Sequence, residues 1–189
     1  MSRIVYLNGE YMPAEQATIS IFDRAVLFGD AIYEVAGVLD GKLIDFSSHM
    51  SRLTRSLTEL DIAQPMTAQQ ILDVYRKLVE MNNLREGLVY MQVSRGVAER
   101  DFTYEPGMIP TVFMFTQETD SSTSESSKTG VALISVPDIR WARRDIKSVN
   151  LLGQVLAKQA AHDAGAYEAL MIGADGNITE CGATSFFIF

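Results

Sequence analysis

The sequence is poor in residues that cross-link chains or bind metal ions. Its 189 residues include one cysteine, Cys181, and two histidines, His49 and His162. A single thiol excludes an internal disulfide and any cysteine-based metal cluster. The two histidines lie far apart, and neither has a second histidine at ligand spacing. We therefore expect a protein that works without a metal ion.

Long hydrophobic runs and an excess of basic charge are also missing. No apolar segment approaches the roughly 20 residues that cross a bilayer, and the chain reaches a turn at Asn8-Gly9 before a signal-peptide core forms. The net charge is −8, with no block of basic residues. Such a surface disfavours nucleic acid and anionic membranes as partners. The expectation is a cytoplasmic protein that binds neither.

Apolar residues are absent from one internal segment. Residues 117–130 read QETDSSTSESSKTG, a serine-rich stretch typical of a solvated linker. It divides the chain into an N-terminal α+β domain at 1–116 and a second domain at 131–189. The second domain has about 60 residues and several apolar strands, which need partners on both faces. We therefore expect the chain to be truncated at its C-terminus.

Turn residues between alternating segments predict hairpins. Asn8-Gly9 lies between 4–7 and 10–12, and Asp40-Gly41 lies between 31–39 and 42–46. Further strands are expected at 88–94, 111–116, 131–136, 167–172, from 178 onward, and 184–189. Together with the helices below, they indicate an α+β fold.

Three segments show helical periodicity. Apolar residues recur at helical spacing after residue 48, with Ser47 or Ser48 as the expected N-cap. Thr67 and Gln70 form a capping box that opens a second helix. A third helix is expected at 151–164, ending at Gly165 in the left-handed conformation.

Lysine chemistry is the strongest functional signal. An enzyme that forms a Schiff base needs a lysine that is partly desolvated or has cationic neighbours. Four of the five lysines are explained as solvated or as surface residues whose stems pack: Lys42, Lys77, Lys128 and Lys158.

Lys147 differs from the others. It lies on an extended segment just before a helix, and Arg143 and Arg144 are close enough in sequence to favour its neutral amine. Spacing alone leaves a basic surface stripe equally open.

Four separated motifs resemble one family. RRDIKSVNLLGQVLAKQAAHDAGAYEALMI and GNITECGATSFF, together with the earlier DRAVLFGDAIYEV and HMSRL, resemble segments of the class IV (fold type IV) pyridoxal-phosphate aminotransferases. The D-amino acid transaminases are the nearest match. The resemblance covers essentially the whole chain, and the family's members run about half as long again. It implies a small N-terminal α/β domain and a larger, β-barrel-like C-terminal domain.

The resemblance also implies residue roles for the cofactor. Lys147 would form the Schiff base with pyridoxal 5'-phosphate and move the substrate α-proton. Glu180 would pair with the ring nitrogen and keep it protonated. Arg52 would bind the phosphate with its guanidinium fork, and Thr184, in a loop of small residues, would supply a hydroxyl. Without the family, Arg52 is explained as a solvated helix residue and Glu180 as a turn residue.

For the substrate, the resemblance points to Tyr33 and Arg100 as carboxylate-binding residues, Arg100 coming from the neighbouring subunit of a homodimer. Alternatively, Tyr33 is a core aromatic and Arg100 an exposed loop charge. The family has a histidine where this chain has Phe102, which removes a hydrogen-bond donor and favours bulkier or less acidic substrates.

The predicted function is amino transfer between a D-amino acid and a 2-oxo acid. Two activities of the same fold stay open, an aminodeoxychorismate lyase and a branched-chain amino acid aminotransferase. The second is weaker, because the segment after Arg95 lacks that group's usual glycine- and asparagine-rich loop. An inactive interaction protein that keeps the fold is the alternative from another class.

Overall fold

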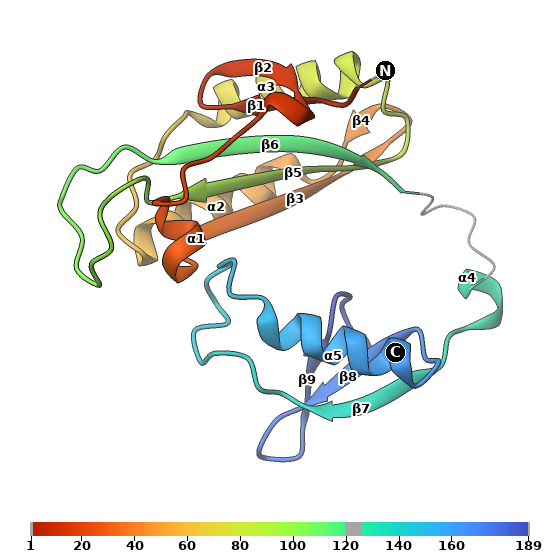
Figure 1. The fold of residues 1–189 in the computed structure, drawn as a ribbon. Coiled ribbons are helices and arrows are strands. Elements are labelled where there is room, and N and C mark those ends of the chain that lie inside the picture. Colours follow the sequence, from red (N-terminus) through yellow and green to blue (C-terminus); the bar gives the residue numbers. More distant parts are fainter. Residues whose placement is uncertain (1, 120–125, 189) are drawn as a thin grey trace. The chain divides into compact units, whose positions relative to one another are not determined.

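The computed structural model describes residues 2–119 and 126–188, which form two units (Figure 1). The first unit comprises Met1–Ser121 and Asp145–Val149, and the second comprises Ser122–Arg144 and Asn150–Phe189. The short segment at 145–149 thus clusters with the first unit, although it follows the serine-rich stretch in sequence. None of the helices described is long and apolar enough to cross a membrane.

An antiparallel sheet of six strands, in the order β2-β1-β6-β5-β3-β4, forms the frame of the first unit. The strands are β1 (Ile4–Leu7), β2 (Glu10–Pro13), β3 (Ala31–Leu39), β4 (Lys42–Leu43), β5 (Gly87–Ser94) and β6 (Thr111–Glu118). Both expected hairpins are present, with Asn8 and Asp40 at positive φ as two-residue turns require. β6 runs two residues into the serine-rich segment, and β4 is shorter than expected.

The two long helices of the first unit lie on one face of this sheet (Figure 1). The helices are α1 (Arg24–Phe28), α2 (Phe46–Glu59) and α3 (Ala68–Met81), with a short 3-10 turn, η1 (Ala14–Gln16), after β2. The capping box of α3 is confirmed, because the Thr67 hydroxyl accepts from Gln70 N and the Gln70 side chain accepts from Thr67 N. The expected cap of α2 is wrong. This helix begins at Phe46 after Asp45, whose left-handed backbone turns the chain out of β4 directly into the helix.

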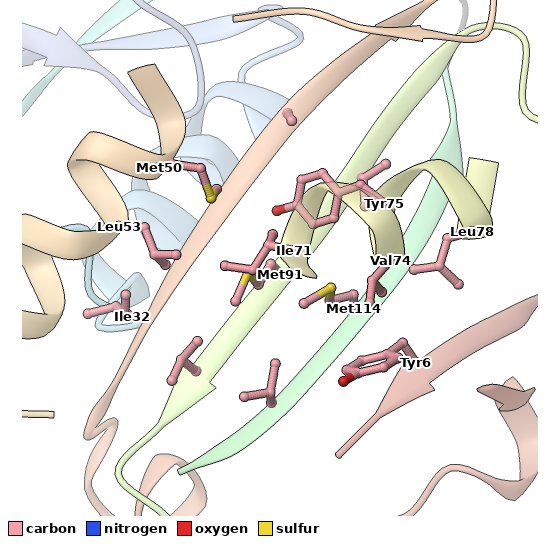
Figure 2. Packing of buried hydrophobic residues seen from close by; sticks show 14 of the residues in the cluster. Tyr6, Ile32, Met50, Leu53, Ile71, Val74, Tyr75, Leu78, Met91 and Met114 are labelled. Carbon is pink, nitrogen blue, oxygen red and sulfur yellow. The ribbon is translucent and has the colours of Figure 1, made fainter. Parts of the chain in front are cut away.

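Residues from alternating strand positions meet the two long helices to form the core (Figure 2). Met91 and Met114 point from the sheet toward Ile71 and Val74 of α3, and Leu53 packs beside Ile32 from α2. Met91, Met114, Ile71 and Ile32 are fully buried. The period-two burial of β3, β5 and β6 leaves their other residues half-exposed on the opposite face of the sheet.

Over its described residues, the second unit has a three-stranded sheet, a short helix and one longer helix. Its elements are α4 (Ser126–Thr129), β7 (Leu133–Pro137), α5 (Leu152–Asp163), β8 (Glu168–Ile172) and β9 (Ile178–Cys181). β7 and β8 are parallel and β8 and β9 antiparallel. Gly165 has the expected left-handed backbone after α5. The strand expected at 184–189 is wrong for residues 184–188. β9 ends at Cys181, and no described strand pairs with residues 182–188. Phe189 lies outside the described residues.

Candidate functional site

Backbone pairing with β3 places Lys147 in the first unit. Tyr33 N donates to Lys147 O at 3.0 Å, and Val149 N donates to Ala31 O at 3.1 Å. Lys147 N donates to the Ser56 hydroxyl of α2 at 3.2 Å. The segment therefore continues the sheet edge beside the first half of β3. The main chain of Lys147 is thus held by β3 and α2.

The Lys147 amine meets Tyr33, another residue that the resemblance singles out. Lys147 Nζ donates to Tyr33 Oη at 3.3 Å, and Nζ lies 4.4 Å from the centre of the Tyr33 ring. Two residues 114 positions apart in sequence are thus brought into contact. The expected basic neighbour Arg144 instead bonds to Asp138 of the second unit.

Arg52 is held by a carboxylate that sequence reasoning missed. Arg52 Nε and Nη2 each donate to Glu34 at 2.7 Å, in a bidentate pair. His49 Nδ1 lies 2.8 Å from the same carboxylate. Glu34 is fully buried, whereas the Arg52 side chain is 43% exposed. The hydrogen bonds to Glu34 raise the pKa of Arg52 above its ordinary value, so the guanidinium stays charged.

The position of Glu34 follows from the pleat of β3. Tyr33 and Glu34 are neighbours, so their side chains point to opposite faces of the sheet. Tyr33 therefore meets Lys147, while Glu34 faces α2 and Arg52. The signal that could have revealed Glu34 is an acidic residue at a core position of an alternating strand, because such a charge needs a partner.

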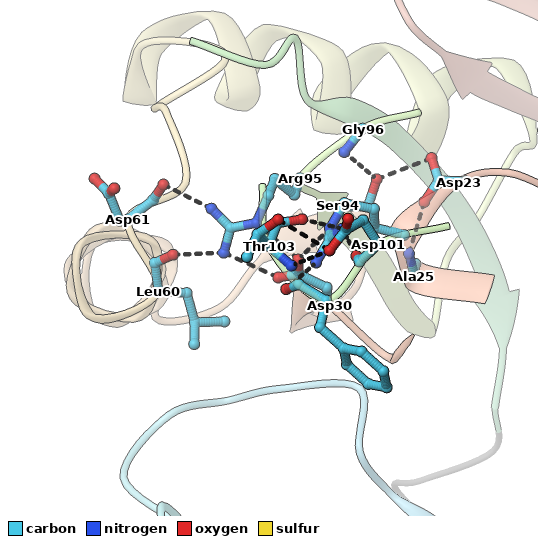
Figure 3. A network of polar contacts seen from close by, with 12 residues as sticks. Asp23, Ala25, Asp30, Leu60, Asp61, Ser94, Arg95, Gly96, Asp101 and Thr103 are labelled. Carbon is cyan, nitrogen blue, oxygen red and sulfur yellow. Dashed lines mark hydrogen bonds and ion pairs between the residues drawn. The ribbon is translucent and has the colours of Figure 1, made fainter. Parts of the chain in front are cut away.

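A polar network anchors the loop that carries Arg100 (Figure 3). Asp30 accepts from Arg95 Nε at 2.7 Å and Nη2 at 3.0 Å, and from Arg24 Nε at 2.8 Å. Arg24 Nη1 donates in turn to the carbonyls of Asp101 and Thr103. Burial alone would raise the pKa of Asp30, but the hydrogen bonds from Arg95 and Arg24 outweigh it and hold the pKa below the usual range.

Gly96 allows this loop to begin. Its φ is +113°, and a Cβ atom there would lie 2.1 Å from the Ile109 carbonyl oxygen. Farther along, the Arg100 guanidinium carbon lies 5.6 Å from the Phe28 ring centre and 5.4 Å from that of Phe102. Phe102 is 78% exposed. Arg100 is thus supported by two aromatic rings.

In the second unit, the small-residue loop after β9 is organised by another buried carboxylate. Glu168 Oε2 accepts from Ala183 N at 3.2 Å, from Lys158 Nζ at 3.2 Å and from the Thr184 hydroxyl at 3.4 Å. A Cβ atom on Gly182 would lie 2.9 Å from Glu168 Oε1, so any larger residue there would force the Glu168 carboxylate to shift. Glu168 was also missed from sequence.

Desolvation and hydrogen bonding act in opposite directions on Glu168. Burial raises its pKa, but the hydrogen bonds from Ala169 N, Lys158 and Ala183 N outweigh that effect and lower the pKa below its ordinary value. Glu180, the other expected cofactor residue, lies on β9 opposite Met171 and accepts from Cys181 N at 3.2 Å. Lys147, Tyr33, Arg52 and Arg100 belong to the first unit, and Glu180 and Thr184 to the second.

Each unit by itself carries groups of the kinds that a phosphorylated aldehyde needs. The first unit provides a primary amine beside a phenol and a permanently charged guanidinium. The second provides a carboxylate and a glycine-containing loop with a hydroxyl. These are the groups that fit the aldehyde, ring nitrogen and phosphate of pyridoxal phosphate.

Comparisons with known proteins give the class. The family model for class IV amino-transferases matches residues 31–189, and the chain belongs to this family. Two curated relatives carry the name D-alanine aminotransferase. The chain is 40% identical over 167 residues to a D-alanine aminotransferase of Staphylococcus aureus, covering 88% of this chain and 59% of the relative. It is 36% identical over 184 residues to the D-alanine aminotransferase of Bacillus licheniformis, covering 97% of this chain and 64% of the relative.

Solved structures show the same fold. The branched-chain amino acid aminotransferase of Escherichia coli superposes with a TM-score of 0.86 at 18% identity, over 96% of this chain and 63% of that one. A putative 4-amino-4-deoxychorismate lyase from Legionella pneumophila gives 0.77 at 24% identity, over 89% and 62%. At such identities the likeness shows the fold alone. The chain spans about 60% of the length of its curated relatives.

Proposed function

We propose that the protein is a pyridoxal-phosphate-dependent aminotransferase that exchanges an amino group between a D-amino acid and a 2-oxo acid. The observation that carries the proposal is the contact between the Lys147 amine and the Tyr33 hydroxyl, in a chain 40% identical to a D-alanine aminotransferase. When bound, the cofactor supplies an aldehyde for an amine and a ring that withdraws electrons.

Each residue then has a distinct task. Lys147 would hold the cofactor through its amine and would carry the substrate α-proton. Arg52, kept charged by Glu34, binds the phosphate with the N–H groups that Glu34 does not engage. In the second unit, Thr184 and its loop would supply hydrogen bonds to a cofactor phosphate, and Glu180 would pair with the ring nitrogen.

The substrate is held by its carboxylate. Tyr33 donates a hydrogen bond from beside Lys147, and Arg100 supplies the opposite charge from the neighbouring subunit of a homodimer. Because Phe102 offers an aromatic face instead of a polar donor, the site favours amino acids with larger or less acidic side chains. The site of action is the cytoplasm.

The test compares two lysine variants in the purified protein. Lys147→Ala should abolish amino transfer and the visible absorbance of the bound cofactor, whereas Lys77→Ala, at an exposed position of α3, should leave both unchanged. Amino transfer retained by Lys147→Ala would refute the assignment. A panel of D- and L-amino acids with pyruvate or 2-oxoglutarate tests the substrate class. A response to L-substrates alone would exclude the D-specific reaction and favour a branched-chain activity.

Two other functions have their own signatures. Release of pyruvate from aminodeoxychorismate would indicate the lyase reaction, for which the structural likeness at 24% identity gives only the fold. A cofactor spectrum that no amino donor changes would indicate an inactive protein that retains the fold.

A further inference from the structure

A row of stacked aromatic rings crosses the half-exposed face of the first unit's sheet and ends at Tyr33. The Tyr33 and Tyr90 rings lie 5.6 Å apart, with 18° between their planes. Tyr90 stacks in turn on Phe115, at 4.8 Å and 19°, and on Phe113, at 6.0 Å and 23°. Of these rings, Tyr33 alone meets the Lys147 amine.

The register of the sheet explains the row. Tyr90 is paired with Phe115 across β5 and β6, while Tyr33 is paired with Gln92, so Tyr90 is the diagonal neighbour of Tyr33. Diagonal neighbours on one face lie within reach of aromatic side chains. The Tyr90 hydroxyl donates to Gln92 Oε1 at 2.9 Å, which fixes the outer end of the ring. Tyr90 is therefore held on both sides and can hold Tyr33.

We propose that Tyr90 is a positioning residue for the reaction at Lys147, acting through the ring of Tyr33. Rotation of a tyrosine ring about the Cβ–Cγ bond leaves the hydroxyl oxygen in place, because that oxygen lies on the rotation axis, but rotation about the Cα–Cβ bond would carry the hydroxyl away from a partner. The stack removes this freedom on one side of the Tyr33 ring. The Tyr33 hydroxyl is then kept at 3.3 Å from Lys147 Nζ before any substrate arrives.

The burial of Tyr90 agrees with a structural rather than an acid–base task. Burial raises the pKa of Tyr90 to about 12, so the phenol is neutral near pH 7. Its hydroxyl proton is engaged by Gln92. What Tyr90 offers to Tyr33 is therefore its ring face. This inference rests on the proposed function, because it takes Lys147 as the reacting amine.

The test uses Tyr90→Met, which keeps an apolar side chain of similar reach and removes the stack, in the intact protein loaded with pyridoxal phosphate. We expect kcat to fall about tenfold, with KM changed less than about twofold. The rate at which the cofactor-free protein gains the visible absorbance of bound pyridoxal phosphate should fall by a similar factor. Tyr90→Phe keeps the ring and should restore both rates to within about twofold of wild type. Phe113→Leu is the matched control, since Phe113 contacts Tyr90 but not Tyr33.

A double-mutant cycle with Tyr33→Phe identifies the route of the effect. If Tyr90 acts through the Tyr33 hydroxyl, Tyr90→Met adds less than a twofold loss in the Tyr33→Phe background. Equal losses in both backgrounds, a loss confined to KM, or the same loss in Phe113→Leu would each overturn the proposal. If Tyr90→Met does not fold by circular dichroism, Tyr90→Leu replaces it. If neither folds, Tyr90→Phe decides, because a tenfold loss with the ring retained would contradict the role given to the stack. Absence of amino transfer in the wild type would instead refute the proposed function.

Discussion

Replacing Glu34 with glutamine should lower the free energy of unfolding of the first unit and weaken the binding of a phosphate. The carboxylate is fully buried and accepts three short bonds, two from Arg52 at 2.7 Å and one from His49 at 2.8 Å. Glutamine fills the same volume but carries no charge, and its NH2 group must face one of these donors. Hydrogen bonds to charged groups contribute about 1.5–3 kcal/mol and neutral ones about 0.5–1.5 kcal/mol, so each bond loses roughly 1 kcal/mol.

Solvent reduces this sum. The Arg52 side chain is 43% exposed, so water replaces part of what its two bonds lose. We therefore expect the free energy of unfolding to fall by about 2 kcal/mol, which is less than the full loss at all three bonds. Urea unfolding curves followed by circular dichroism measure this change. Release of the Arg52 fork should weaken pyridoxal phosphate binding about tenfold, or about 1.4 kcal/mol. Equilibrium titration of the cofactor-free protein measures that change.

The control is Glu80→Gln, which removes the same charge from an exposed position of α3. Surface substitutions of this kind change stability by less than about 0.5 kcal/mol. If Glu34→Gln behaves like Glu80→Gln in both measurements, Glu34 neither stabilises the unit nor positions Arg52. A loss of stability with unchanged cofactor affinity would separate the two roles and refute the second.

Three further outcomes test the fold and the loop network. Thr67→Ala removes the capping box of α3 and should lower the free energy of unfolding by about 1 kcal/mol, with Thr58→Ala, on an exposed part of α2, as a comparison for the loss of a hydroxyl. Leu78→Ala truncates a fully buried core residue and should cost about 2–5 kcal/mol in the same urea assay; a cost under 1 kcal/mol would contradict its packing. Asp30 has a lowered pKa in the folded protein, so its stabilisation is present above about pH 4 and is lost as the pH falls through the folded value. Urea midpoints from pH 5 to pH 2 should therefore fall less steeply in Asp30→Asn than in wild type, and parallel slopes would refute this.

Local patterns in the sequence predict local structure well in this chain. The Asn8-Gly9 turn and the capping box at Thr67 depend on a few adjacent residues, and both are present as expected. The expected N-cap of α2 is wrong, because Ser47 and Ser48 satisfy the sequence rule while Asp45 already turns the chain. A left-handed aspartate has no stronger local signature than a serine cap, so only the path out of β4 decides between them.

Pairing across long sequence separations could not be predicted in this way. Residues 145–149 fall inside the second domain that the sequence predicts at 131–189, but their backbone groups pair with β3 next to Tyr33. Nothing in the local pattern of an extended segment says which strand it will join. The motifs did single out Lys147 and Tyr33, whose side chains are in contact, because the family resemblance carries tertiary information that periodicity lacks.

Three carboxylates that the sequence did not single out share one physical role. Glu34, Asp30 and Glu168 lie in the interior or near it, and each accepts bonds from a cation and from at least one further group. An unpaired buried charge costs several kcal/mol of folding free energy. Each carboxylate therefore holds its partners in place and is held in place by them. The partners of Glu34 and Glu168 include the proposed phosphate residues Arg52 and Thr184, and Asp30 anchors the loop of Arg100. Of the three, Glu34 alone occupies a core position of an alternating strand, whereas Asp30 lies just before β3 and Glu168 begins β8, where the first two residues are both buried. Alternation could therefore have pointed to Glu34, but Asp30 and Glu168 depend on tertiary contacts that the local pattern does not carry.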